Sequence, residues 1–260
     1  MRLKTFMMMI LAMFMMQLTV AGANYYFWQG KLDNNSVKMA CAVEDGVMTG
    51  EMFVPFEGTE QVYEVAGYEQ GGMFDIRVYS TEGGEKGIYV VYFLRAQLKG
   101  GELVGIDQQG GKKFRLHKYQ DKFAHPINAS NAEYSSPYVE GKTYQLHGWD
   151  RGGEYLYENA MGVKGELTLW ANMEDESYNL SIRRDSGAYG SGSDALVEAR
   201  VVYPSEEGDF DYTIPSCDYS FSVKFYDHFL VIRSLAGSPK KCFGSGAAIT
   251  GIYILVPAKG

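Results

Sequence analysis

Few stretches of the 260-residue sequence carry residue types that could perform chemistry, and the most suggestive is residues 240–256, KKCFGSGAAITGIYILV. It places Cys242 beside two glycines, as a phosphate-binding loop or a reactive thiol would. A dinucleotide loop needs a third glycine at position 249 and leads from a strand into a helix, whereas this stretch has Ile249 and leads into an apolar run. Residues 190–195, GSGSDA, fit the looser form of the motif but also precede a strand pattern. We interpret both stretches as glycine turns and expect no cofactor.

Other catalytic patterns are weak. The G-x-S-x-G elbow of the α/β-hydrolases is absent, and the four histidines form no H-x-H or H-x-x-x-H pair, so no metal site is expected. Carboxylates are densest at Glu154 with Glu158 and at residues 174–176. Two carboxylates about 5–10 Å apart could hydrolyse a glycoside, but solvated surface positions explain these clusters as well. We assign no catalytic residue.

Aromatic side chains are the remaining feature, with 20 tyrosines and three tryptophans. Tyrosine combines an apolar ring with a polar hydroxyl, which suits barrel walls, sugar stacking and protein interfaces. Most of these rings are expected to be cross-strand packing residues. The candidates for an aromatic binding cleft are Tyr25, Tyr26, Trp28, Trp149, Tyr155, Tyr157 and Trp170.

The elements that must position these side chains are β-strands. From residue 25 onward, apolar and polar residues alternate in short runs separated by Gly, Asp and Asn, and no amphipathic helix is evident. A first domain over 24–120 is predicted as an up-and-down antiparallel meander of seven or eight strands. It either closes into a small barrel or stays open against a second sheet. The predicted strands are 25–33, 36–44, 47–56, 61–69, 73–80, 87–98, 102–107 and 112–119.

A linker and a second β-domain follow. Residues 121–132 lose the alternation and are interpreted as a linker. Alternation returns at 163–171, 178–183, 195–203 and 217–225, so residues 133–260 are predicted to form a β-barrel or a sandwich. The fold class is therefore all-β with two antiparallel domains.

The N-terminal segment indicates export. Arg2 and Lys4 precede an apolar run and a small-residue cleavage pattern, so residues 1–23 are predicted to be a cleaved signal peptide. No cysteine follows the predicted cleavage point, and no later run reaches the ~18 apolar residues of a spanning helix. We expect a periplasmic or secreted protein without a transmembrane segment.

Charge excludes one class of partner. Without residues 1–23 the chain has 22 basic and 32 acidic residues, a net charge of −10. Nucleic-acid binding needs clustered Lys and Arg to neutralise phosphates, and no basic stripe is present. Nucleic acid is not expected as a partner.

Three cysteines in an exported protein predict one disulfide and one free thiol. The alternation in residues 36–43 places Cys41 on the apolar face of its strand, as a buried thiol. Cys217 and Cys242 are then the predicted pair, at the open end of a hairpin that runs out along 217–225 and back along 229–235. Closing a loop of this length contributes about 3 kcal/mol.

Several motifs resemble known exported proteins. Cys217, the strand after it, the run Cys242-Phe243-Gly244-x-Gly246 and Gly251-x-Tyr253 resemble the ending of small exported β-domains of Gram-negative bacteria, with Phe243 in place of a glycine. The stretches GEMF at 50–53 and EVAG at 64–67 resemble lipocalin-like or avidin-like meanders. Residues 186–189, SGAY, resemble the inhibitory loop of periplasmic lysozyme inhibitors. The resemblance implies a bacterial envelope or secreted β-barrel protein.

Three functions are compatible with these features. The first is a non-enzymatic binding module for a small molecule, a glycan or a protein, with a concave pocket above about 300 Å³ lined by Tyr and Trp. The second is an envelope interaction protein, including a lysozyme-inhibitor-like one, whose surface loops bind the partner. The third is a carboxylate-dependent hydrolase. Filled barrels without such a pocket would contradict the first function and favour the second.

Overall fold

The structure is a computed structural model that describes residues 24–119, 152–172, 177–185, 194–202, 208–226, 228–244 and 247–257. Several sequence predictions lie outside these ranges. They are the signal peptide 1–23, the linker 121–132, the candidate Trp149, the acidic cluster 174–176, the SGAY loop 186–189 and most of the glycine-rich stretch 190–195.

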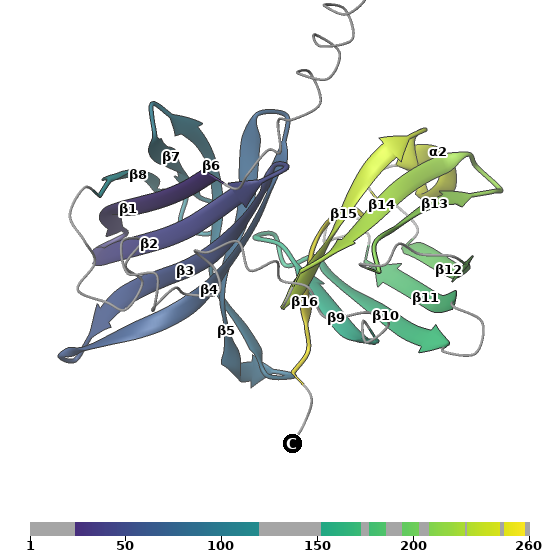
Figure 1. Cartoon of the computed structure of the whole chain (residues 1–260), viewed down its shortest axis with the longest axis horizontal. Coiled ribbons are helices and arrows are strands. Elements are labelled where there is room, and N and C mark those ends of the chain that lie inside the picture. Colours follow the sequence, from purple (N-terminus) through teal and green to yellow (C-terminus); the bar gives the residue numbers. More distant parts are fainter. Residues whose placement is uncertain are drawn as a thin grey trace, which may run out of the picture.

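The first eight strands form a closed antiparallel barrel, coloured purple to teal in Figure 1. Each strand pairs with the next, and β1 pairs with β8 through three residue pairs that begin at Trp28 and Lys118. This confirms the predicted meander and shows that it closes. The strands are β1 (Asn24–Leu32), β2 (Asn35–Glu44), β3 (Val47–Phe56), β4 (Thr59–Gln70), β5 (Met73–Glu85), β6 (Ile88–Lys99), β7 (Glu102–Asp107) and β8 (Lys113–Lys118).

Two-residue turns set the register of this barrel. Five of its hairpins are joined by two residues that both have positive φ, as in Asp45 (49°) and Gly46 (70°). Positive φ at both positions is the type I′ geometry, whose twist matches that of the flanking strands. The other four turns have glycine at the second position and are Glu57-Gly58, Gly71-Gly72, Lys86-Gly87 and Gly100-Gly101.

The first barrel is filled by its own side chains. Trp28, Met39, Met52 and Leu94 have no exposed surface and belong to one cluster inside the barrel. Cys41 lies in the same cluster and is 1% exposed, which confirms the predicted buried thiol. Burial, and then the nearby Glu51 carboxylate, raise the pKa of this thiol well above its ordinary value.

A β-bulge changes the face of one predicted strand. Strict alternation along residues 87–98 would place Ile88 and Val90 on the same face as Tyr92, which lies in the barrel core. In the structure Val78 pairs with Tyr92 and Tyr79 pairs with Val90, so one residue of β6 is left over. Such an extra residue reverses which side chains point inward. Ile88 and Val90 consequently point out of the barrel and pack against the second domain.

The second domain is a nearly closed barrel, shown in green and yellow in Figure 1. Its sheet order is β12-β11-β10-β9-β16-β15-β14-β13, in which β16 pairs with β9 and joins two four-stranded meanders. Of the two predicted alternatives, a barrel and a sandwich, the second domain is a barrel with one open side. The strands are β9 (Gly153–Glu158), β10 (Lys164–Asn172), β11 (Ser177–Arg184), β12 (Ala195–Val202), β13 (Phe210–Ile214), β14 (Tyr219–Phe225), β15 (Phe229–Ala236) and β16 (Gly251–Leu255).

The predicted disulfide joins Cys217 to Cys242, whose Cα atoms are 5.4 Å apart. Cys242 lies in α2 (Pro239–Phe243), a short helix that the sequence did not reveal because five residues give no periodicity. Gly237 brings the chain against the carbonyl of residue 218, where a Cβ atom would lie 2.4 Å from that oxygen. The hairpin therefore returns to its start, as the pairing predicted.

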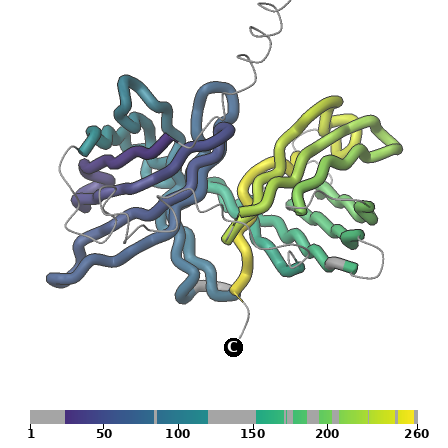
Figure 2. Tube along the Cα trace, in the orientation of Figure 1, coloured from purple at the N-terminus to yellow at the C-terminus, as the bar shows by residue number. Residues whose placement is uncertain are grey.

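The two barrels pack through their outer faces and lie side by side in the tube view of Figure 2. Val47, Ala66 and Tyr79 of the first barrel meet Phe229 and Ile254 of the second in one apolar cluster. The described part of the chain contains no helix with the length and apolar character that crossing a bilayer requires.

Candidate functional site

The predicted aromatic cleft is divided between the two barrels. Tyr26 stacks on Trp28 at the wall of the first barrel, with ring centroids 5.1 Å apart. Trp28 is completely buried and donates a hydrogen bond from Nε1 to the Gly101 carbonyl at 2.7 Å. Tyr25, on the opposite side of the same strand, is 41% exposed. These rings are packing residues of the first barrel, apart from the exposed Tyr25.

The other candidates belong to the second barrel. Tyr155 and Tyr157 are buried in its core, while Trp170 is 64% exposed on β10. The guanidinium of Arg184 lies 3.5 Å from the ring centroid of Tyr157 and donates to its hydroxyl and to the Thr250 carbonyl. The described candidates therefore do not share one cleft. Strand parity buries most of them in two separate interiors, and ligand binding by any one of them stays a prediction.

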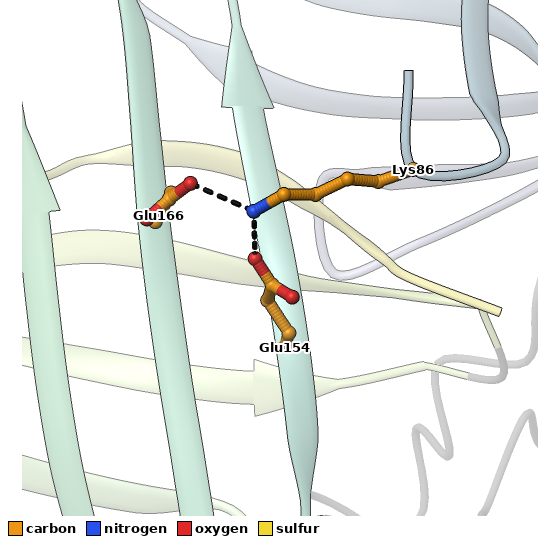
Figure 3. Close-up of polar contacts among 3 residues, drawn as sticks. All are labelled: Lys86, Glu154 and Glu166. Atoms are coloured by element: carbon orange, nitrogen blue, oxygen red, sulfur yellow. Dashed lines mark hydrogen bonds and ion pairs between the residues drawn. The ribbon is translucent and has the colours of Figure 1, made fainter. Parts of the chain in front are cut away.

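A different group of side chains meets where the barrels face each other. Lys86 lies at the tip of the β5–β6 turn and extends from the first barrel toward the second (Figure 3). Its ammonium group donates to Glu154 on β9 and, at 2.9 Å, to Glu166 on β10. These hydrogen bonds, that to Glu154 first, raise the pKa of Lys86 above its ordinary value. The three residues form what we call the Lys86 latch.

The Lys86 latch borders a small groove of about 130 Å³ between the barrels. Its walls are apolar, with Ile88 and Val90 from the first barrel and Leu156 and Ile254 from the second. Tyr157, one of the predicted aromatic candidates, also lines the groove. Its rim is polar and contains Lys86, Glu158, Lys164 and Glu166. An apolar floor with a few polar groups at its edge is the usual composition of a ligand site.

A buried arginine, Arg77, contacts the backbone of Glu158, which lines this groove. Arg77 on β5 is 4% exposed, and its Nε donates to the Glu158 carbonyl of the second barrel at 3.0 Å. Its guanidinium also lies 5.0 Å from the ring centroid of Phe93. Because a buried guanidinium is costly unless its donors are satisfied, this contact fixes the position of the first barrel against β9.

The arrangement supports binding better than catalysis. Glu154 and Glu166 do converge, as a hydrolytic carboxylate pair would, but the Lys86 ammonium lies between them and neutralises part of their charge. Within the described ranges, no three His, Cys, Asp or Glu side chains gather as ligands for a metal ion. The groove offers apolar contact and hydrogen bonding.

Two larger hollows lie elsewhere on the surface. One, of about 340 Å³, crosses the outside of the first barrel beside Lys31, Lys38 and Phe53. Another, of about 280 Å³, lies between β12 and β13 of the second barrel. Both are more open than the groove between the barrels, and no Tyr or Trp lines either of them.

Comparisons with known proteins do not identify the chain, because no family model, no curated protein and no solved structure matches it. The resemblance to exported lipocalin-like and avidin-like proteins therefore stays a prediction.

The sequence predicts only one member of the Lys86 latch. Glu154 belongs to a carboxylate cluster, but no sequence pattern distinguishes Lys86 or Glu166 from other surface residues. Lys86 is 68 residues from Glu154 and 80 from Glu166 along the chain. No local pattern connects positions that meet only because two barrels pack by their outer faces. The one available signal was a charged residue in a glycine turn, Lys86 before Gly87.

Proposed function

We propose that the protein is a non-enzymatic binding module whose ligand site is the groove between the two barrels. The observation that carries this proposal is the combination of apolar walls and a charged rim in one groove formed by both domains. The barrel interiors are occupied by packed side chains, and the groove is smaller than the pocket above about 300 Å³ that the sequence led us to expect. Filled barrels favour an interaction at the protein surface over a ligand inside a barrel, so the proposed site lies where the outer faces of the two barrels meet.

The size of the groove limits what enters it. A volume of about 130 Å³ is smaller than that of a typical site for a whole drug-sized ligand. It is close to the ~150 Å³ engineered cavity that holds one benzene molecule. The ligand therefore inserts a single ring or branched aliphatic group and places a polar group at the rim, beside Lys86 or Glu166.

We further infer that binding takes place outside the cytoplasm. The predicted signal peptide and the Cys217–Cys242 disulfide support this location, since disulfides persist in oxidising compartments. The periplasm and the cell exterior are both compatible with these two features.

A methyl NMR screen tests the proposed site. Protein labelled at isoleucine methyl groups would be titrated with single-ring amines, carboxylic acids and sugars. A ligand in the groove shifts the signals of Ile88 and Ile254, which line it, and leaves the buried Ile76 unchanged.

Two matched variants decide where a ligand binds. Val90→Trp fills the groove and should abolish the shifts, whereas Leu196→Trp adds the same ring at an exposed position on β12 and should preserve them. Ligands that bind Val90→Trp as well as the wild type, or that never shift Ile88 and Ile254, would contradict the proposal.

A further inference from the structure

The second barrel has an open seam between β12 and β13. Among the described residues, β12 pairs only with β11 and β13 pairs only with β14. Within the part of the chain that the structure describes, each strand therefore has one edge without a neighbouring strand, and the two edges belong to the same barrel wall. Backbone N–H and C=O groups along such edges are a template for pairing with an added strand.

The chain between these strands is long enough to leave room for a third strand. Seven residues, 203–209, connect β12 to β13, whereas two residues connect most hairpins of the first barrel. An inserted strand would hold β12 and β13 two strand spacings apart, about 9.6 Å.

A hollow of about 280 Å³ lies along this seam. Val201 from β12 and Phe210 from β13 face inward and are buried in the barrel core. Val202 is 44% exposed on the outer face. A strand lying here would alternate in the same way, with apolar side chains toward Val201 and Phe210 and the others toward solvent.

The end of the seam away from this hollow is covered by helix α2. Helix α2 contacts both β12 and β14, and its Phe243 packs edge-on against Tyr219 at 6.0 Å between ring centroids. The disulfide from Cys242 holds this helix in place. β13 has five residues and is shorter than β12, so an added strand that pairs with both edges would be about that short.

Charge favours a cationic partner. The hollow is lined by two acidic residues, Asp209 and Asp211, and one basic residue, Lys224. Asp211 is exposed on β13 and forms no ion pair among the described residues. The chain as a whole is acidic, with a formal net charge of −8. Opposite charges placed across neighbouring strands stabilise the pairing.

We propose that the seam between β12 and β13 binds an extended segment of another protein as an added β-strand, with apolar side chains inward and a lysine or arginine outward beside Asp211. The bound segment completes the second barrel through main-chain hydrogen bonds to both edges. This function is independent of the groove between the barrels and uses none of its residues.

A synthetic peptide tests the proposal on the full mature chain. The probe is an acetylated and amidated seven-residue peptide of alternating valine and lysine, with binding measured by fluorescence anisotropy of a labelled copy. Bound peptide should slow amide hydrogen exchange in both β12 and β13 and leave β1 to β8 unchanged. A peptide N-methylated at alternate residues cannot donate along one edge and should lose binding.

Charge variants locate the contact. Asp211→Lys should weaken binding of the valine–lysine peptide by about fivefold and improve binding of a valine–glutamate peptide. Asp185→Lys, an exposed change after β11, is the matched control and should alter neither. The proposal is overturned if exchange slows in only one of the two strands, if the N-methylated peptide binds equally well, or if neither peptide binds. Dimerisation of the chain through β12, detected by light scattering, would also overturn it.

Discussion

The two barrels have the same number of strands and differ in how they close. In each, the first and last strands of the domain pair, β1 with β8 and β9 with β16. The first barrel then has a neighbour on both sides of every strand, while the second is interrupted between two consecutive strands, β12 and β13. Pairing of the terminal strands is therefore not sufficient to close a barrel.

Turn chemistry explains the difference. Two-residue type I′ turns force consecutive strands to be neighbours. Five-residue connections also keep strands together where a side chain orders them, as Asp107 does by accepting hydrogen bonds from the amides of Gln109 and Gly110. The connection from β12 to β13 is longer, with seven residues between the two strands. A closed barrel is rigid around its whole wall, whereas a seam leaves an edge that can bind a partner.

The largest expected effect concerns the apolar contact between the barrels. Phe229→Ala should destabilise the protein by about 3–5 kcal/mol, because Phe229 is 3% exposed and packs in the cluster between the domains. Scanning calorimetry should show the two barrels melting separately, with the second barrel first. Phe56→Ala, at a ring that is 50% exposed, is the control and should change little. A single shared melting transition in the Phe229 variant would contradict this prediction, because the two barrels would then unfold together without the Phe229 contact.

The next effect is specific to the open barrel. Loss of the disulfide in Cys217→Ser should cost about 3 kcal/mol, since the bond closes a loop with a sequence separation of 25. Only the second barrel should lose stability, because both cysteines and α2 belong to it. In a background in which Trp149 and Trp170 are replaced by Phe, fluorescence of Trp28 would report the first barrel, and circular dichroism would report the whole chain. Equal destabilisation of both barrels would contradict this assignment.

The smallest effect concerns the Lys86 latch. Lys86→Met should cost at most about 1 kcal/mol at pH 7, because the ion pairs are partly exposed. The pKa of Lys86 is raised in the folded state, so the latch contributes fully below the unfolded pKa of about 10.4 and is lost as pH rises through the folded value. Denaturant unfolding at pH 7 and above pH 11 measures this change.

A matched variant completes that comparison. Lys113→Met removes an exposed lysine on β8 that has no ion pair among the described residues, and its effect should not depend on pH in this way. A difference between Lys86→Met and wild type that persists undiminished at high pH would mean that the methylene chain of Lys86, rather than its charge, makes the contact.

The sequence was sufficient to predict most of the first barrel. Residues 47–56 were predicted as a strand and form β3 with the same bounds, because Asp45-Gly46 and Glu57-Gly58 are strong turn signals on either side. The buried Cys41 and the Cys217–Cys242 pairing also followed from alternation and cysteine number. These features depend on local chemistry and on parity along a strand.

The candidate site could not be predicted in the same way. The bulge that turns Ile88 and Val90 outward exists only in the pairing of β5 with β6. Predicting the Lys86 latch requires knowledge of which outer faces of the two barrels meet. Alternation of apolar and polar residues does not distinguish a face covered by another barrel from one covered by water. The seam is also a property of pairing, since β12, which has a neighbour on one side only among the described residues, still alternates regularly between buried and exposed positions.

Native-state hydrogen exchange, measured on the free protein by NMR, tests the contrast between a closed and an open barrel most directly. Amides of β1 and β8 that face each other across the closing pair should be protected through three residue pairs. The amides of β12 and β13 that face the seam should exchange at least about 100-fold faster than amides of the same strands that face β11 and β14. Equal protection of both edges of β12 and β13 would show that the second barrel is closed in solution and would contradict the account.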